Sequence, residues 1–228
     1  MPLPKHKPKR RLPNCDFAKT EAGCATCGVD GFVAGTTILT KHGWRDVATL
    51  AKGDHVWTLE HDWQPVMWIE GRDIWRQPGT CPASVSPIWV PMGALGNQQD
   101  LLVQGETFVA IASADFQAIT GHSHALVSGF DCEGFNGIEL YQPEEPRRLY
   151  EVHFENEELV AIGGGAIACC PSFLGALNFD PHEGEASASA SASGLPKLSP
   201  AAAAEFLNIV TEELADQAQA QDQPKAAS

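Results

Sequence analysis

Residues 31–69 read GFVAGTTILTKHGWRDVATLAKGDHVWTLEHDWQPVMWI, and this stretch decides the fold. Apolar and β-branched residues occur there in short runs that Gly, Pro and Asp turn signals separate. The same texture continues beyond residue 69, and the runs that we expect to form strands lie at residues 36–40, 55–59, 65–69, 101–103, 108–111, 149–154 and 159–162. Because runs of this length are too short for most helices, the sequence predicts an all-β, meandering domain.

The chain is long enough to bury one core. It has 228 residues, 43% of them hydrophobic, which leaves residues over for tails. Four tryptophans, Trp44, Trp57, Trp68 and Trp89, lie in or near the apolar runs. Side chains of this size usually fill a core or cover a sheet, so we expect them to pack and not to form a binding platform.

The segments before the β domain differ from it in composition. Residues 1–14 form a basic, proline-broken arm without periodicity, which we expect to be disordered. Residues 15–30 form a leader that contains three cysteines. The β domain itself is expected to extend over residues 31–175.

The segments after the β domain predict a linker and a helix. Residues 176–198 contain the low-complexity sequence SASASASG, which is typical of a flexible linker. Ser199 and Pro200 supply an N-cap and a first helical residue, and apolar residues follow at helical spacing. We therefore expect an amphipathic helix over 199–217, which docks on the domain or on a partner, and a polar tail over 218–228.

Charge argues against nucleic acid as a ligand of the main domain. The net charge is −14, although five of the 15 Lys and Arg residues lie in the arm, which leaves ten against 29 acidic residues elsewhere. Such a body repels a phosphate backbone, whereas the arm is either a solvated terminus or a contact for an acidic partner, nucleic acid or a membrane surface. The sequence shows no apolar run long enough for a transmembrane segment and no signal peptide. A cytoplasmic location is therefore the default, with non-classical secretion as the alternative.

Seven cysteines do not define a disulfide framework. Cys15, Cys24 and Cys27 include one Cys-x-x-Cys pair of the kind that binds zinc, and unpaired thiols or a disulfide are the alternatives. Cys169 and Cys170 end an apolar run, where small residues that fill the core are the simpler interpretation. Apart from this zinc hypothesis, the sequence indicates no cofactor.

Four consecutive blocks of sequence carry a family resemblance: GFVAGTTI at 31–38, GWRDV at 43–47, LAKGDHV at 50–56 and WQPVMWI at 63–69. They resemble the patterns C-F-x-x-G-T-x-I, G-W-x-x-V, L-x-x-G-D-x-V and Q-P-V-x-W-I of bacterial Hedgehog/intein (Hint) domains, in the same order and at matching spacings. Residues 91–103 and 148–153 are similar to later segments of that family. The resemblance implies an all-β Hint horseshoe fold over residues 31–175, in which Gly35 and Gly53-Asp54 supply turns.

Hint domains process their own chains, and the resemblance implies which positions carry that chemistry. A thiol or hydroxyl of the first residue attacks the preceding carbonyl, and the resemblance places Gly31 at that position. The family's Thr/Ser-x-x-His element donates a proton to the departing nitrogen, and its two places hold Gln104 and Thr107. The asparagine that cyclises in inteins falls near Gly164. Since glycine, glutamine and threonine lack the required groups, we predict a degenerate active site.

Two functions follow from these substitutions. The first is a Hint-fold protein without self-splicing or self-cleaving activity, which acts as a binding or structural module and meets a protein partner through the basic arm or the C-terminal helix. The second is an autoprocessing domain that cleaves its chain near Gly31 or Cys27 with an atypical nucleophile. His122 and His124 are candidate bases or metal ligands for it, although a surface loop is the simpler interpretation.

Overall fold

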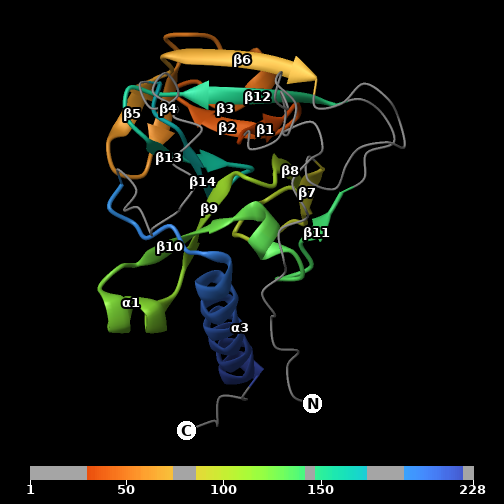
Figure 1. Cartoon of the computed structure of the whole chain (residues 1–228), viewed down its shortest axis with the longest axis vertical. Coiled ribbons are helices and arrows are strands. Elements are labelled where there is room, and N and C mark those ends of the chain that lie inside the picture. Colours follow the sequence, from red (N-terminus) through yellow and green to blue (C-terminus); the bar gives the residue numbers. More distant parts are fainter. Residues whose placement is uncertain (1–29, 74–85, 142–146, 174–192, 223–228) are drawn as a thin grey trace, which may run out of the picture.

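The computed structural model describes residues 30–73, 86–141, 147–173 and 193–222. Within these ranges the chain forms two antiparallel sheets, α1 (Ala114–Thr120) and α3 (Pro200–Asp222), with the helices below the sheets in Figure 1. Two short 3₁₀ turns, η2 (Val47–Thr49) and η4 (Gly129–Cys132), connect strands. This arrangement confirms the predicted all-β fold with a C-terminal helix.

The first sheet places the start of the domain between two distant strands. Its order is β11 (Glu139–Leu140), β7 (Pro87–Val90), β8 (Leu101–Gln104), β1 (Phe32–Val33), β12 (Arg148–His153) and β6 (Trp68–Asp73). Phe32 of β1 pairs with Val103 of β8 on one side and with Tyr150 of β12 on the other. The residues just before β1 therefore lie beside the end of β8 and the middle of β12.

The second sheet contains the remaining strands. Its order is β10 (His124–Ser128), β9 (Phe108–Ala112), β14 (Ala166–Cys170), β13 (Glu158–Ile162), β2 (Thr37–Thr40), β4 (His55–Thr58) and β5 (Asp62–Pro65), and β3 (Gly43–Asp46) pairs with β2. Every residue of β13 is buried, because this central strand is covered on both faces.

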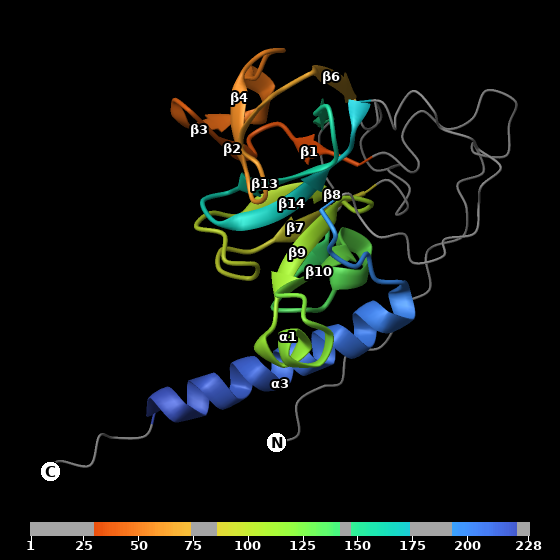
Figure 2. The same ribbon diagram turned by 90° about the vertical axis from the view of Figure 1, so that its left-hand side faces the viewer.

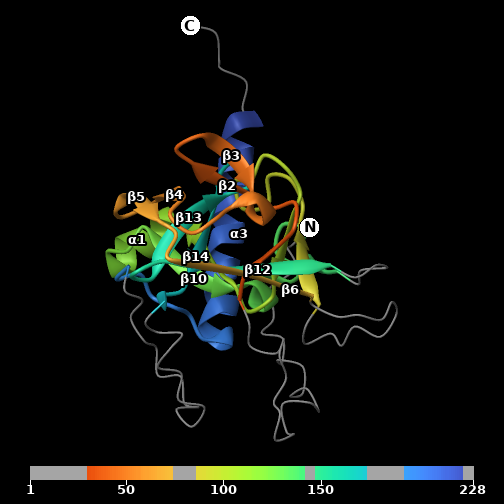
Figure 3. The same cartoon turned by 90° about the horizontal axis from the view of Figure 1, so that it is seen from above.

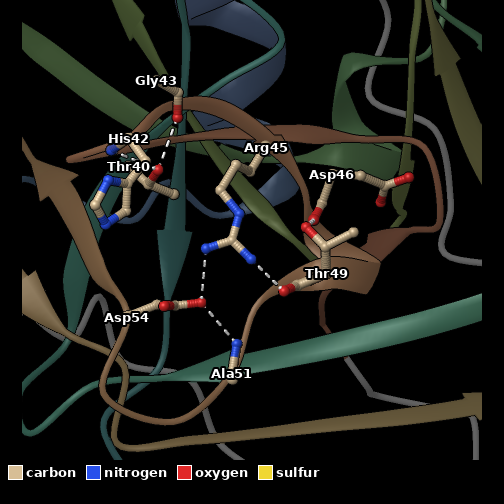
Figure 4. Close-up of polar contacts among 8 residues, drawn as sticks. All are labelled: Thr40, His42, Gly43, Arg45, Asp46, Thr49, Ala51 and Asp54. Carbon is tan, nitrogen blue, oxygen red and sulfur yellow. Dashed lines mark hydrogen bonds and ion pairs between the residues drawn. The ribbon is translucent and has the colours of Figure 1, made fainter.

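Side-chain hydrogen bonds hold the turns around β3, η2 and β4 (Figure 4). The Arg45 guanidinium pairs with the Asp54 carboxylate at 3.0 Å, and the same carboxylate oxygen accepts the Ala51 N–H at 2.9 Å. Asp46 caps η2 by accepting the Ala48 N–H at 2.8 Å. Gly53 adopts a φ of 91°, so this turn uses the conformational freedom of glycine. The blocks GWRDV and LAKGDHV thus specify one connected turn network.

The strand expected over residues 65–69 is not continuous. β5 ends at Pro65 and β6 begins at Trp68, and the chain passes from the second sheet to the first between them. Val66 exchanges backbone hydrogen bonds with Gly53 and Asp54, whereas the Met67 N–H donates to His153. The run reads as one strand because its residues are apolar throughout, although their burial differs: Pro65 is exposed, Val66 is buried and Ile69 is partly buried.

Helix α3 completes the core. Its buried residues Ala203, Phe206, Leu207 and Val210 belong to the main hydrophobic cluster, and Phe206 meets Phe116 of α1 edge to face at 5.0 Å. Figures 2 and 3 show the helix running beneath the sheets, with α1 against it. The Ser199 hydroxyl accepts the Ala202 N–H at 3.4 Å, as expected of an N-cap. The helix docks on its own domain and extends to Asp222, beyond the predicted end at 217.

Trp44 was expected to pack, but it lies on β3, an edge strand, with 41% of its surface exposed. Trp57, Trp68 and Trp89 are partly buried, in agreement with the expectation. Helix α1 was not expected, although the Ser113 N-cap and the left-handed Gly121 at its end are ordinary helix signals. The run is too short and too mixed in polarity to reveal a helical period.

Candidate functional site

The junction of Asp30 and Gly31 lies where the chain enters the first sheet. The Gly31 N–H donates to the Thr107 hydroxyl at 2.8 Å, and this hydroxyl donates to the Gly31 carbonyl at 3.0 Å. The Gln104 N–H donates to the same carbonyl at 3.0 Å. Folding therefore brings together the three residues that sequence comparison placed at the catalytic positions, although 76 residues separate Gly31 from Thr107.

The backbone leaves no room for a side chain at Gly31. Its φ is 144°, a conformation that residues with a Cβ rarely adopt. A Cβ atom built there would lie 2.5 Å from the Tyr150 carbonyl oxygen and 3.4 Å from Leu149 Cδ1. Because Tyr150 belongs to the paired strand β12, its carbonyl has little freedom to move. A nucleophilic side chain at position 31 would thus require the β1–β12 pairing to change.

Gln104 and Thr107 close the turn between β8 and β9. Both residues are buried, and the Thr107 N–H donates to the Gln104 carbonyl at 2.9 Å. An amide and an aliphatic hydroxyl do not exchange protons near neutral pH. This corner of the site therefore offers hydrogen bonds to the Gly31 peptide at the positions where the resemblance predicts a proton donor.

Sequence reasoning missed Asp30, although its carboxyl group belongs to the junction and directly precedes Gly31. Burial raises the pKa of its carboxyl group to about 6, while its own backbone N–H and the charge of His153 oppose the shift and Glu151 adds to it. Lys197 also favours the ionised form. The carboxyl group is consequently neutral in a substantial fraction of molecules at mildly acidic pH.

The groups around Asp30 form a buried polar layer on β12 and its neighbours. Glu151 and His153 lie on the same face of β12 because two positions separate them. Glu151 forms an ion pair with Arg72 of β6, and His153 Nε2 lies 3.8 Å from the Glu151 carboxylate. The His153 ring is 3% exposed and lies 4.8 Å from the Trp68 ring, and within the described residues neither of its nitrogens has a hydrogen-bond partner. Such a layer is unusual in a domain core.

The segment that precedes α3 reaches the same layer. Residues 196–198 lie alongside β10, where Leu126 exchanges backbone hydrogen bonds of 2.9 Å with Pro196 and Leu198. Lys197 pairs with Glu157, and its ammonium group lies 5.3 Å from the centre of the Phe108 ring. A residue far from the leader in sequence therefore contributes positive charge near Asp30.

Thiols do not supply a nucleophile in the described part of the chain. Cys132, Cys169 and Cys170 are buried and free, and burial raises the pKa of each well above its ordinary value. Cys169 and Cys170 lie at the end of β14, as expected of residues that fill the core. The candidate zinc ligands Cys15, Cys24 and Cys27 fall outside the described ranges, in which no group of His, Cys, Asp or Glu side chains is arranged to hold a metal.

His122 follows α1, which lies below the sheets in Figure 1, and His124 is the first residue of β10. His122 is exposed, and His124 begins β10 with its Nδ1 2.8 Å from the Ser123 hydroxyl. Burial lowers the pKa of His124. The structure therefore does not bring these histidines to Gly31.

Gly164 lies in the turn between β13 and β14, where a Cβ atom would meet the Gln98 side chain at 2.8 Å. By contrast, Cys169 and Cys170, at the other end of β14, interact electrostatically with Asp30. The end of β14, and not its first turn, therefore approaches the junction.

Comparison with known proteins identifies the family. Residues 30–168 match the Hint domain, which is more than half of the chain. The chain belongs to the Hint domain family. No curated protein matches the sequence significantly.

Solved inteins and intein-like domains are similar in structure. A bacterial intein-like domain from Clostridium thermocellum is 14% identical, with a TM-score of 0.45, over 61% of this chain and 97% of that domain. The AceL NrdHF class 3 split intein, a splice-inactive variant, is 10% identical, with a TM-score of 0.43, over 63% of this chain and 99% of that one. The gp41-1 intein is 8% identical, with a TM-score of 0.38, over 61% and 98%. In the described ranges, no helix has the length and apolar character needed to cross a membrane.

Proposed function

We propose that this Hint domain does not carry out the acyl shift that begins self-processing in its family, and that it acts as a binding or structural module. The observation that carries the proposal is the closed backbone at Gly31, where a Cβ atom would lie 2.5 Å from the Tyr150 carbonyl oxygen. A missing side chain removes the acyl acceptor. The lack of space for any side chain at this position supports the view that the backbone has adapted to the loss of the nucleophile.

The proton donor is replaced in the same way. Thr107 binds both the N–H and the carbonyl of Gly31, so its hydroxyl is engaged in fixing the backbone. Two positions that the resemblance assigns to catalysis, Gly31 and Thr107, thus hold groups whose contacts stabilise the backbone. This supports a domain that has kept the fold of its family without the self-processing chemistry.

Helix α3 limits where a protein partner binds. The apolar residues of its first half are buried in the domain's own core, so they are not available to a partner. Its second half contributes the exposed Leu214 to a groove of about 350 Å³, which the buried Val210, the turn at Gly93–Gly96 and strand β9 also line. The basic arm over residues 1–14 is the other candidate contact.

The loss of the acyl shift is tested by intact mass. The purified full chain of 24.4 kDa, incubated at neutral pH, should give the same species with and without a thiol, because no thioester forms for the thiol to capture. The triple variant Gly31→Cys, Gln104→Thr, Thr107→His supplies the thiol, the hydroxyl and the imidazole of the family pattern. Its response to thiol is compared with that of the parent chain. A fragment that begins at Gly31, released from the parent chain by thiol, would overturn the proposal.

The binding role is tested with paired surface variants. Leu214→Glu places a charge at the groove, whereas Ile119→Glu places one on an exposed residue of α1 outside it. A partner that co-purifies with the full chain should be lost with Leu214→Glu and kept with Ile119→Glu. Equal retention by both variants would show that the groove is not the contact. A variant that lacks residues 1–14 would then test the basic arm.

A further inference from the structure

We propose that the Asp30–Gly31 peptide bond is a self-cleavage site at which the Asp30 carboxyl group is the nucleophile and releases residues 1–30. This reaction goes beyond the proposed function, because it needs neither a side chain at position 31 nor a thioester. It depends on the position of one carboxyl group relative to the bond that the Hint fold presents.

Covalent geometry puts the nucleophile within reach. The Asp30 carboxyl oxygen and the Asp30 carbonyl carbon close a five-membered ring, so rotation about the side-chain bonds is the only movement required. The other carboxyl groups of the buried layer, such as Glu151 and Glu157, belong to strands or loops elsewhere in the chain. Asp30–Gly31 is also the single Asp-Gly pair in the sequence. The junction thus combines an internal nucleophile with a following residue that has no Cβ to obstruct the carbonyl.

The bonds of Gly31 favour departure of its nitrogen. The Thr107 hydroxyl oxygen accepts the Gly31 N–H at 2.8 Å, and the Gly31 carbonyl is held by Thr107 and by the Gln104 N–H, each at 3.0 Å. An acceptor already placed on this nitrogen binds it more strongly when the nitrogen gains a proton and positive charge. The same anchors oppose the alternative reaction, in which the Gly31 nitrogen attacks the Asp30 side chain, since that nitrogen would have to leave Thr107.

The reaction balances without a cofactor or an oxidant. The neutral Asp30 carboxyl group forms a bond from its oxygen to the Asp30 carbonyl carbon, and its proton passes to the Gly31 nitrogen. The carbon–nitrogen bond breaks, its electron pair remains on nitrogen, and Gly31 becomes a new amino terminus. The cyclic anhydride left on Asp30 is then opened by one water molecule, which yields two carboxyl groups.

The charged surroundings make this reaction dependent on pH. Glu151 and His153 face Asp30 from β12, Cys169 and Cys170 approach it from β14, and Lys197 approaches from the segment before α3. Arg72 and Glu157 pair with members of this layer. Since burial raises the pKa of the Asp30 carboxyl to about 6, the reactive neutral form should decline between pH 5 and pH 7.5, with a roughly 30-fold fall in rate.

The test uses the purified full chain, incubated between pH 5 and pH 7.5 and followed by intact mass. We expect fragments 1–30 and 31–228 to appear about 30 times faster at pH 5 than at pH 7.5. Asp30→Ala should abolish them, and Asp30→Glu, which needs a larger ring, should slow them at least tenfold. Circular dichroism and urea unfolding confirm that each variant is folded.

Three controls separate this mechanism from ordinary acid hydrolysis. The Asp180–Pro181 bond of the same chain is an internal standard for acid lability, and cleavage after Asp30 should precede cleavage after Asp180. Urea should remove that preference. In ¹⁸O-labelled water, opening of an anhydride places label on either carboxyl group of Asp30, whereas direct hydrolysis labels the α-carboxyl alone.

The outcomes are decisive in either direction. No fragment that begins at Gly31 at pH 5, an unchanged rate in folded Asp30→Glu, label confined to the α-carboxyl, or isoaspartate formation without cleavage would each overturn the inference. Thiol-dependent cleavage at neutral pH would instead contradict the proposed function, so the two failures are distinguishable.

Discussion

The Arg45–Asp54 turn network and the Gly31 junction belong to neighbouring sequence blocks, yet different parts of the chain hold them together. In the network, side chains make the contacts: the Arg45 guanidinium, the Asp54 carboxylate and the Asp46 cap hold the backbone (Figure 4). At the junction, the backbone of Gly31 and Gln104 and one hydroxyl make them. The comparison teaches that the framework of this fold and its chemistry are specified by separate residues.

The largest expected effect comes from adding a side chain at the junction. Gly31→Cys should lower the free energy of unfolding by about 3 kcal/mol, because the new Cβ meets the Tyr150 carbonyl and the positive φ is strained. Gly35→Ala is the matched control, since Gly35 also has a positive φ but has no atom within 4 Å of the added Cβ. Urea denaturation should give a loss of about 1 kcal/mol there. Equal losses would show that the junction is not closed.

Two buried threonines allow a direct comparison of the regions. Thr107 at the junction and Thr40 in the turn network each accept one backbone N–H and donate to one backbone carbonyl. Thr107→Val should lower the free energy of unfolding by about 2 kcal/mol, since it leaves the buried Gly31 N–H without its acceptor. Thr40→Val should cost about 1 kcal/mol, because water can reach the exposed residues His42 and Gly43 that it contacts. Only Thr107→Val should also slow release of residues 1–30 at pH 5. If Thr40→Val slowed the release as much, the effect of Thr107→Val would result from lower overall stability and not from its contacts with Gly31.

The pH dependence of stability sharpens the contrast further. The Asp30 pKa is raised in the folded state, so folding favours the neutral acid; its contribution is fully present below pH 4 and is lost as the pH rises through about 6. Replacing Asp30 with Ala should therefore flatten the stability profile between pH 4 and pH 7, by about 2 kcal/mol relative to the parent. Unfolding at fixed temperature across that range, completed before any cleavage, provides the measurement.

The smallest effect is expected in the network. Asp54→Ala removes an ion pair and the acceptor of the Ala51 N–H, but both partners of the ion pair are partly exposed, so the loss should be about 1 kcal/mol. Lys52→Ala alters an exposed residue of the same turn and should change stability by less than about 0.5 kcal/mol. A loss for Asp54→Ala as large as that for Gly31→Cys would reverse the ranking of the two regions.

Much of the fold was predictable because it is local. The short apolar runs located β2, β4, β8, β9, β12 and β13, and Ser199-Pro200 located the start of α3. The remaining strands lie wholly or mostly outside the predicted runs, several of them because they have only two to four residues. The crossing at residues 66–67 was hidden, since a run that changes sheets keeps its apolar pattern. The end of α3 was also misplaced, because alanine and glutamine continue a helix without an apolar face.

The junction was predictable only in part. Family motifs indicated Gly31, Gln104 and Thr107, and the fold does place them together. Asp30, Glu151, His153 and Lys197 were not indicated, because their proximity results from β1–β12 pairing and from a segment more than a hundred residues away. Only Asp30 carried a signal in the sequence, because its carboxyl group directly precedes Gly31.

The zinc hypothesis for Cys15, Cys24 and Cys27 stays a prediction. Metal analysis of purified protein should find one zinc per chain that is lost in Cys24→Ser.

The docking of α3 has a consequence for synthesis in the cell. Phe206, Leu207 and Val210 supply core contacts, yet they are translated after every strand of both sheets. Part of the apolar surface of the sheets therefore stays exposed until the helix has emerged from the ribosome. This interval is when a nascent chain of this kind would depend most on chaperones.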